Sequence, residues 1–484
     1  MITALITQTQ TFQAIGPADW LGGAPMLCVA AGILLAILAE VVPSLSPIRP
    51  VAFAGSLIAA LFFEFKLLAE PQGAIFQGAF SADTTSSFWG VLFLFSGLLA
   101  WLYGQRYYKL EAPFKAEHDI LMLCSVLGML LMAGAEDLLT FFVGLELLSI
   151  PLYALASFRR ARQESVEAGM RYFLLGAFAV GLFLYGTALI YVETGTITLA
   201  GLQAEGIHSK LGLLGTTLVA ASLLFKISVF PFHFWVPDVY QGSPTPVTTF
   251  MSTGTKAAGF AFLFKIAFLF PPGAMATLAV ISIITMSIGN LGALVQSDLK
   301  RMLGYSAVAH AGTLLLAITA GLAGDGQADG PIHAALYYMA AYVFSAAGAF
   351  GIIATLEGDG EQFTKVESLR GLGQRRPWLA SALSLFMLSL AGFPITGGFF
   401  GKYFIFASTL RADLVAVSVI GVLLSVVALG YYLRIILTMW MQPEIEGSVS
   451  PRAYRPSASF ATVLCAVMVL ALGLAPGWFL GRFF

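Results

Sequence analysis

The sequence predicts an all-α polytopic membrane protein, a fold class indicated by its composition, its apolar runs and the charges of its loops. Of its 484 residues, 58% are hydrophobic and only 11% are charged, and the mean hydropathy is +0.86. In an ordinary soluble domain roughly 25% of the residues are charged. The apolar residues come in runs of about 20, the length that an α-helix needs to cross a bilayer. A soluble, disordered or coiled-coil protein is therefore excluded.

The remaining totals exclude further classes of protein. The chain has 25 Lys and Arg against 26 Asp and Glu, so no basic face for nucleic acid is expected. The cysteines Cys28, Cys124 and Cys465 lie far apart within apolar runs, which argues against a disulfide framework or an iron–sulfur cluster. Because residues 1–19 contain no Lys or Arg, we expect no cleavable signal peptide, and the first membrane helix is the targeting signal.

The apolar runs define about fourteen predicted membrane spans, two of which are interrupted. We group 20–103 as N-terminal helices, 118–270 and 275–441 as two halves, and 460–480 as a C-terminal helix. In chain order the spans are 20–42, 51–68, 84–103, 118–132, 138–157, 166–191, 211–241 with a break, 247–270, 275–296, 300–321, 331–357, 377–410 with a break, 413–441 and 460–480.

The cations of the loops test this assignment, because short cytoplasmic loops are rich in Lys and Arg. When alternate loops are placed on opposite sides, one side receives 15 cations and the other receives 3. This asymmetry predicts that both termini lie on the periplasmic side. The first group is Arg49, Arg106, Lys109, Lys115, Arg159, Arg160, Arg162, Lys300, Arg301, Lys365, Arg370, Arg375, Arg376, Arg452 and Arg455, and the second is Lys210, Arg411 and Arg482.

Seven cations remain inside the apolar runs, where each Lys or Arg near a helix centre costs about 2.5–3.5 kcal/mol. Lys66, Lys265 and Arg434 lie near span ends, where a long side chain can reach the interface, and Glu40 and Glu64 are given the same explanation. The other four cations are Arg171, Lys226, Lys256 and Lys402. Lys256 and the acidic Glu146 fall near the middle of their spans, which favours a proton or ion pathway, with a buried structural ion pair as the alternative.

Two spans contain helix-breaking sequences at about mid-depth. Pro231 cannot donate a backbone hydrogen bond and clashes with the carbonyl of Ile227, and a second break is expected around Pro394. Transporters place such discontinuous helices at their ion sites. Each break has a lysine nearby, Lys226 and Lys402 respectively, and the repeated Phe-Pro pair is a faint signal of an inverted internal repeat.

Lysine suits proton transfer in a dry interior. Burial brings its charged and neutral forms close in free energy, and an approaching carboxylate favours the charged form again. Glu146 is the natural partner for Lys226 and Lys256. His233 could relay protons because imidazole titrates near neutrality, although a bond from its ring to a carbonyl freed by the break is nearly as plausible.

The stretch 230–250, FPFHFWVPDVYQGSPTPVTTF, resembles subunit N of the proton-translocating NADH–quinone oxidoreductases, an antiporter-like family of respiratory complex I. The similarity covers essentially the whole chain. It implies that Glu146 modulates Lys226 on the broken seventh helix, that Lys256 links two half-channels, and that Lys402 is the terminal lysine. The family's sixth-helix lysine is Arg171 here, and since arginine is effectively never deprotonated, we expect Arg171 to be a fixed positive partner of Glu146.

The resemblance implies a proton-translocating subunit of an oxidoreductase, with subunits K and M as neighbours, in a bacterial inner membrane. No cofactor is expected on this chain, because Gly401-Lys402 lacks the rest of a phosphate-binding loop and the five histidines do not pair as haem ligands. The FMN, iron–sulfur clusters, quinone and NADH would belong to other subunits. A stand-alone or multi-subunit cation/proton antiporter and a structural spacer with buried ion pairs are the alternatives.

Overall fold

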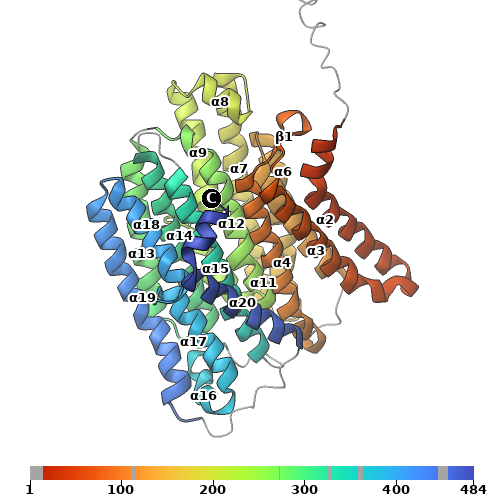
Figure 1. The fold of residues 1–484 in the computed structure, drawn as a ribbon, viewed down its shortest axis with the longest axis vertical. Coiled ribbons are helices and arrows are strands. Elements are labelled where there is room, and N and C mark those ends of the chain that lie inside the picture. The colour runs from red at the N-terminus through yellow and green to blue at the C-terminus, as the bar shows by residue number, and fades with distance from the viewer. Residues whose placement is uncertain are drawn as a thin grey trace, which may run out of the picture.

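The computed structural model describes residues 15–111, 116–271, 273–323, 329–357, 364–444 and 456–483. Three of the loop cations counted above, Lys115, Arg452 and Arg455, and the N-terminal residues 1–14 lie outside these ranges. Nearly all of the described chain is helical, as predicted, and the helices pack side by side into one elongated bundle (Figure 1).

Twelve helices in the described ranges are long and apolar enough to cross a membrane. One of them combines the short helix η1 with α3. Their bounds are α2 Pro17–Val41, η1 Pro43–Ile48 with α3 Arg49–Ala69, α4 Thr84–Glu111, α5 Ala116–Gly134, α6 Leu138–Ala156, α7 Gln163–Thr194, α9 Lys210–Ile227, α13 Ala274–Leu294, α14 Leu299–Ala323, α15 Asp329–Leu356, α19 Val415–Met441 and α20 Pro456–Leu474.

Two further predicted spans are present as shorter pieces. The predicted span 247–270 is not one regular helix. It consists of α11 Thr245–Phe250, the π-helical segment η3 Met251–Thr255, α12 Lys256–Lys265 and η4 Ala267–Leu269. The predicted span 377–410 is divided into α17 Pro377–Ala391 and α18 Gly397–Arg411. The span that begins with α9 likewise continues, after a gap, as α10 Trp235–Gly242.

Small elements that the hydropathy pattern did not predict complete the described structure. A two-stranded antiparallel hairpin pairs β1 Gly73–Ile75 with β2 Phe80–Ala82, and its turn uses positive φ at Gly78. The predicted C-terminal span 460–480 ends early at Leu474, and Pro476 begins a separate helix. The other short helices are η2 Phe76–Gly78, α8 Leu199–Glu205, η5 Val366–Leu369, α16 Leu372–Arg375 and α21 Pro476–Phe483.

The interior of the bundle is filled by α15, whose most apolar 18-residue window is entirely buried. Around it lie α4, α14 and α18, while α2 and α3 splay outward at one edge and α13 and α19 form the opposite edge (Figure 1). Aromatic stacking fixes the packing, as where the rings of Phe141 and Phe262 lie 3.6 Å apart. This arrangement leaves the buried ionisable groups at the contacts between helices rather than facing lipid.

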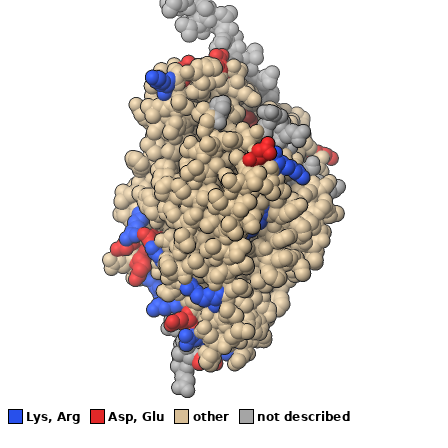
Figure 2. Space-filling view, turned by 90° about the vertical axis from the view of Figure 1, so that its left-hand side faces the viewer, with Lys and Arg blue, Asp and Glu red and all other residues tan. Residues whose placement is uncertain are grey.

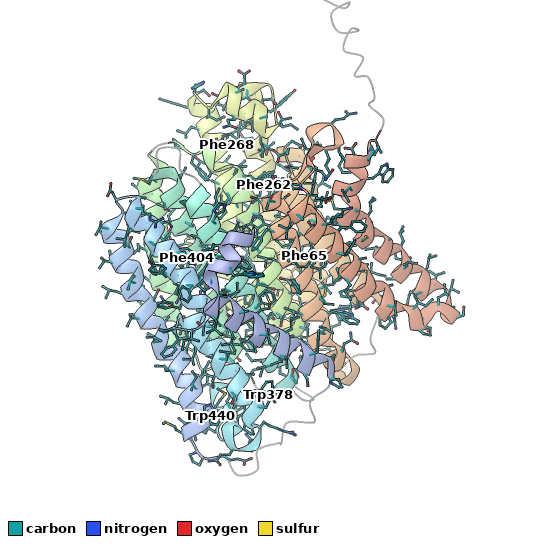
Figure 3. All side chains as sticks on the ribbon, in the orientation of Figure 1. Phe65, Phe262, Phe268, Trp378, Phe404 and Trp440 are labelled. Carbon is teal, nitrogen blue, oxygen red and sulfur yellow. The ribbon has the colours of Figure 1, made fainter. Side chains whose placement is uncertain are left out.

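The outer surface fits a membrane protein. Figure 2 shows charged side chains gathered at the lower end and left-hand edge of one face, with smaller groups near the top and a broad uncharged area elsewhere. Trp378 of α17 and Trp440 of α19 lie near the lower end, whereas Phe268 lies toward the upper end (Figure 3). All three are exposed, and exposed tryptophans such as Trp378 and Trp440 are enriched at the borders of the bilayer.

Candidate functional site

The first break places Lys226 at the end of a half-helix. The helix α9 ends at Ile227, whose carbonyl was predicted to clash with Pro231. Ser228 adopts a left-handed conformation (φ 67°), and its N–H donates to the carbonyls of Leu224 and Phe225. The indole Nε1 of Trp235, from α10, also donates to the Phe225 carbonyl (3.2 Å). The protein itself therefore satisfies the carbonyls of Leu224 and Phe225 at the break, as a membrane interior requires.

The ammonium group of Lys226 is buried and is held by a neutral partner. Its Nζ donates to Ser149 Oγ of α6 at 2.8 Å, and it lies 6.0 Å from the centre of the Tyr172 ring. Glu146, one helical turn before Ser149, acts on Lys226 electrostatically. Both residues lie in the described ranges, and no direct ion pair joins the Lys226 ammonium to the Glu146 carboxylate.

Glu146 lies half-buried on α6 beside Lys226. The helix begins at a side-chain cap, in which Asp137 Oδ1 accepts from the N–H of Thr140 at 2.7 Å. One carboxylate oxygen of Glu146, Oε1, is buried and accepts no hydrogen bond from any described residue. A carboxylate with a free oxygen close to a buried lysine can strengthen or weaken its hold on that lysine by a small movement.

Lys256 is the first residue of α12 and follows the π-helical segment directly. Its side chain is 1% exposed, and Nζ donates to the backbone carbonyl of Ala307 on α14 at 2.5 Å. Single π-helical turns inside α-helices are frequent at functional sites. One turn further, a Cβ at Gly259 would lie 3.4 Å from Lys226 Cγ, so Lys226 packs against the helix that carries Lys256.

His310, which sequence reasoning did not select, lies between Lys256 and Lys402. Its Nδ1 is hydrogen-bonded to the Tyr338 hydroxyl, and its Nε2 lies 3.0 Å from the Tyr432 hydroxyl. Both Lys256 and Lys402 act on this histidine electrostatically. The Tyr342 ring, 5.0 Å from the imidazole and 5.9 Å from Lys256 Nζ, fills the space between them.

At the second break the lysine follows the break, whereas Lys226 precedes the first. The helix α17 ends at Ala391, Gly392 takes positive φ (86°), and Phe393 N–H bonds back to the Leu388 carbonyl. Lys402 follows on α18, and its Nζ reaches back to the carbonyl of Ala391 at 2.9 Å. A cation is favoured there because the carbonyls at a helix C-terminus carry partial negative charge. The expectation of a lysine beside each break is confirmed.

Arg171 does not pair with Glu146, so that expectation is wrong for this structure. Its guanidinium is 54% exposed and lies 2.7 Å from Asp238 Oδ2 of α10 and 3.8 Å from Glu167, one turn earlier on α7. Asp238 also binds Arg301 of α14. The acidic partner nearest in space lies 67 residues along the chain, a contact that single-helix reasoning could not find.

The structure does not place His233 among the buried lysines and His310. It is half-buried in the first break, and the Phe230 ring lies 6.1 Å from its own. Its buried Nδ1 makes no hydrogen bond with any described residue. The alternative, a bond from Nδ1 to a carbonyl freed by the break, is therefore not observed. A relay role for His233 stays a prediction.

The charged residues assigned to span ends divide into two groups. Lys66 is exposed, Lys265 pairs with Glu136 at 2.8 Å, and Arg434 Nη1 donates to the Leu294 carbonyl. Glu64 contradicts the assignment, because its side chain is 5% exposed and faces α4 at Gly90, where a Cβ would lie 2.3 Å from Oε1. The missing side chain of Gly90 provides the space for this carboxyl group.

Five ionisable residues lie at the contacts between helices, and we call them the ionisable row: Glu146, Lys226, Lys256, His310 and Lys402. It starts at Glu146 and Lys226 on α6 and α9, passes Lys256 and His310 on α12 and α14, and ends at Lys402 on α18. Hydroxyl groups bond two of its members, with Ser149 accepting from Lys226 and Tyr338 and Tyr432 bonded to His310. Among the described residues no cluster of His, Cys, Asp and Glu could hold a metal ion.

These features define a class of protein: a polytopic membrane protein with ionisable side chains buried beside interrupted helices, as in ion-translocating proteins. The chain is 38% identical over 468 residues to NADH-quinone oxidoreductase subunit N 1 of Chloroherpeton thalassium, covering 95% of this chain and 96% of that one. It is also 38% identical over 416 residues to a subunit N 1 of Solibacter usitatus, covering 84% of each. The chain belongs to the NADH:quinone oxidoreductase/Mrp antiporter transmembrane family, which matches residues 135–428.

Solved structures agree with this family. A chain of respiratory complex I from Thermus thermophilus with bound aureothin superposes with a TM-score of 0.82 at 37% identity, covering 94% of this chain and 98% of that chain. A chain of the Mrp complex from Dietzia sp. DQ12-45-1b gives a TM-score of 0.84 over 96% of each chain, but at 21% identity it shares the fold alone. The resemblance to subunit N inferred from the sequence is confirmed.

Proposed function

We propose that this protein is a membrane-arm subunit of an NADH–quinone oxidoreductase and moves protons along the row from Glu146 to Lys402. The proposal rests on the burial and the neutral hydrogen-bond acceptors of three lysines. Lys226, Lys256 and Lys402 are 6%, 1% and 8% exposed, and each ammonium donates to a neutral oxygen rather than to a carboxylate. A buried cation with no fixed counter-charge loses its proton at small cost.

The charge of Glu146 would set the proton occupancy of Lys226. When the carboxylate approaches, it favours the charged ammonium, and when it withdraws, Lys226 releases its proton toward Lys256. His310 then connects Lys256 to Lys402, because its two ring nitrogens face two tyrosine hydroxyls and imidazole exchanges protons readily. Lys402 releases the proton on the far side of the row.

Energy for this transfer would come from redox chemistry in other subunits. The relatives are subunits of NADH-quinone oxidoreductases, and we propose that FMN, iron–sulfur clusters, quinone and NADH are bound outside this chain. We also propose subunits K and M as neighbours and a bacterial inner membrane with both termini on the periplasmic side.

We further propose that 118–270 and 275–441 are two antiporter-like halves related by inversion. Support comes from the helix ends at the breaks. Ser228 and Gly392 both have positive φ, and in both cases the next residue bonds back five residues, from Val229 to Leu224 and from Phe393 to Leu388. The Phe-Pro pair begins two residues after Ser228 but one residue after Gly392. Because of this difference of one residue, the repeated pair is weaker evidence for an internal repeat.

The substitution Lys226→Met tests the proposal, with Lys66→Met as the matched control because Lys66 is exposed on α3. In inverted membrane vesicles that contain the assembled complex, NADH oxidation and proton uptake are measured together. We expect Lys226→Met to lower the rate of proton uptake by roughly tenfold or more, while Lys66→Met leaves it unchanged. An unaltered rate of NADH oxidation together with an unaltered proton-to-electron ratio in Lys226→Met would instead support the structural-spacer reading.

A cation/proton antiporter is a second candidate, because the Mrp complex shares this fold. The chain expressed without its partners and placed in sodium-loaded vesicles distinguishes the two. An antiporter acidifies or alkalises the lumen in exchange for sodium, whereas we expect the isolated subunit to catalyse no such exchange.

A further inference from the structure

An apolar groove of about 500 Å³ lies at the surface where α5 and α7 begin and α6 ends. Its apolar walls come from three helices: Ile120 and Leu121 of α5, Ala154 of α6 and Val166 of α7. Ala154 and Val166 are exposed, so the groove opens outward. Ligand sites commonly have volumes of about 300–1,000 Å³, and the groove is therefore large enough for an organic molecule.

Packed side chains fix the loop that forms one wall of this groove. Phe158, in the loop after α6, lines the groove and meets the imidazole of His118 at a ring distance of 5.6 Å and an angle of 72°. His118 is 1% exposed, so this contact anchors the loop to the interior. A Cβ at Gly169 would lie 2.5 Å from Ser157 Cβ, which shows how closely α7 approaches the same loop. The groove is therefore part of the packed structure.

Two opposite charges lie at the end of the groove on the cation-rich side. Glu117, near the start of α5, and Arg160, in the loop before α7, both line the groove and are exposed. No ion pair joins these two side chains within the described part of the chain. The other arginines of this loop point elsewhere, since Arg159 donates to the Tyr107 hydroxyl at 2.7 Å and Arg162 lines a separate charged hollow. Arg160 and Glu117 therefore offer one positive and one negative group to a ligand in the groove.

An exposed apolar stripe continues from the groove along α6. Ala154, Ile150 and Val143 follow one another at intervals of four and seven residues, so they lie on one face of the helix. Ile150 is 60% and Val143 is 50% exposed. Between Ala154 and Val143 the helix rises about 16 Å. This length is about half of the hydrocarbon core, which is about 30 Å thick, and it matches one leaflet of the bilayer.

We propose that the groove binds one molecule of phosphatidylethanolamine, a phospholipid whose headgroup carries a phosphate and a primary ammonium. The Arg160 guanidinium binds the phosphate, and the Glu117 carboxylate accepts hydrogen bonds from the ammonium. One acyl chain lies in the groove and continues along the stripe of α6. Pockets between membrane helices on the cation-rich side are known places for phospholipid headgroups.

Charge complementarity selects this headgroup over the other common ones. Phosphatidylglycerol brings a negative charge but no cation for Glu117. Phosphatidylcholine brings a trimethylammonium group, which has no N–H to donate to a carboxylate. A headgroup with both a phosphate and an ammonium satisfies both side chains. This inference goes beyond proton transfer and does not depend on it.

Photolabelling of the assembled complex tests the site. Three phospholipid probes carry the same diazirine-bearing acyl chain and differ only in their headgroup, which is phosphoethanolamine, phosphocholine or phosphoglycerol. Each probe is added at the same fraction to phosphatidylcholine proteoliposomes that contain the purified complex, and mass spectrometry locates the labelled residues after irradiation. We expect the ethanolamine probe to label the groove, at Ile120, Leu121 or Val166, at least about threefold more than the other two probes.

Substitutions of the two charged residues separate their roles. We expect Glu117→Gln to lower labelling by the ethanolamine probe to the level of the choline probe, because the carboxylate is removed. Arg160→Gln should lower labelling by the ethanolamine probe at least about threefold, because the phosphate loses its partner. Glu205→Gln and Arg411→Gln are the matched controls, since both residues are exposed and lie outside the groove. Unchanged labelling in both groove variants would overturn the proposal.

The substitution Ala154→Trp tests the groove itself, because it fills the space and leaves both charges in place. We expect it to remove the label from the groove for all three probes, and the rate of NADH oxidation checks that the complex has assembled. Equal labelling of the wild-type groove by the three probes, or a preference for the glycerol probe, would overturn the assigned headgroup. Absence of label from the wild-type groove would show that another chain covers it and would overturn the lipid site.

Discussion

At the scale of single residues, the acceptors of the buried lysines are the informative feature. Lys226 donates to a serine hydroxyl, and Lys256 and Lys402 donate to backbone carbonyls. Carboxylate partners would hold the protons firmly, and apolar surroundings alone would expel the charge. A neutral oxygen accepts a hydrogen bond from the charged form of lysine. Breaking that hydrogen bond costs little free energy when the proton is transferred.

Sequence reasoning found Glu146, Lys226, Lys256 and Lys402 because a charge inside an apolar run is conspicuous. It missed His310, since a lone histidine with tyrosines at distant positions in the sequence looks like an ordinary core residue. The hydrogen bonds of His310 to Tyr338 and Tyr432 reach across 28 and 122 residues. The true partner of Arg171 was hidden for the same reason, as was the burial of Glu64 against Gly90.

The substitution His310→Gln tests the connection between Lys256 and Lys402. Glutamine can form hydrogen bonds with both tyrosines but cannot take up a proton, so we expect proton uptake by the complex to fall roughly tenfold. His208→Gln is the control, because His208 is exposed in the loop before α9. Wild-type pumping by His310→Gln would remove His310 from the pathway.

At the scale of elements, both interrupted helices end at a residue with positive φ. This residue is a serine at the first break and a glycine at the second. Gly392 adopts this conformation without steric cost, whereas Ser228 carries a Cβ that disfavours it. The breaks themselves were predictable from Pro231 and Pro394. The π-helical segment before Lys256 could not be predicted, because the sequence 251–255 contains no residue that forces an extra residue into a helical turn.

Opposite substitutions at the two breaks should therefore shift stability in opposite directions. We expect Ser228→Gly to raise, and Gly392→Ala to lower, the free energy of unfolding by about 1 kcal/mol each. Gly392→Ala has an additional cost, since its Cβ would lie 2.9 Å from Lys402 Cδ. Thermal unfolding of the purified complex in detergent measures both, and equal midpoints for the two variants would contradict this view of the caps.

At the scale of the whole molecule, charge and hydropathy predicted the architecture well. The predicted spans recur as helices or helix pieces, since crossing a bilayer demands a length of apolar chain that short polar breaks cannot imitate. The hairpin β1–β2 and the helix α8 were missed because they lie outside the spans, where hydropathy carries no such constraint. The helix contacts that assemble the ionisable row join distant parts of the chain and leave no local signature.

Proton exchange by the buried lysines is the central claim, and charge-conserving substitution tests it most directly. Arginine keeps the positive charge and the donors of lysine but is effectively never deprotonated. The purified complex with Lys256→Arg is placed in proteoliposomes, with Lys66→Arg as the control, and the protons moved per NADH oxidised are counted. We predict a lower ratio for Lys256→Arg alone, whereas a wild-type ratio in that variant would show that a fixed charge suffices and would contradict the account.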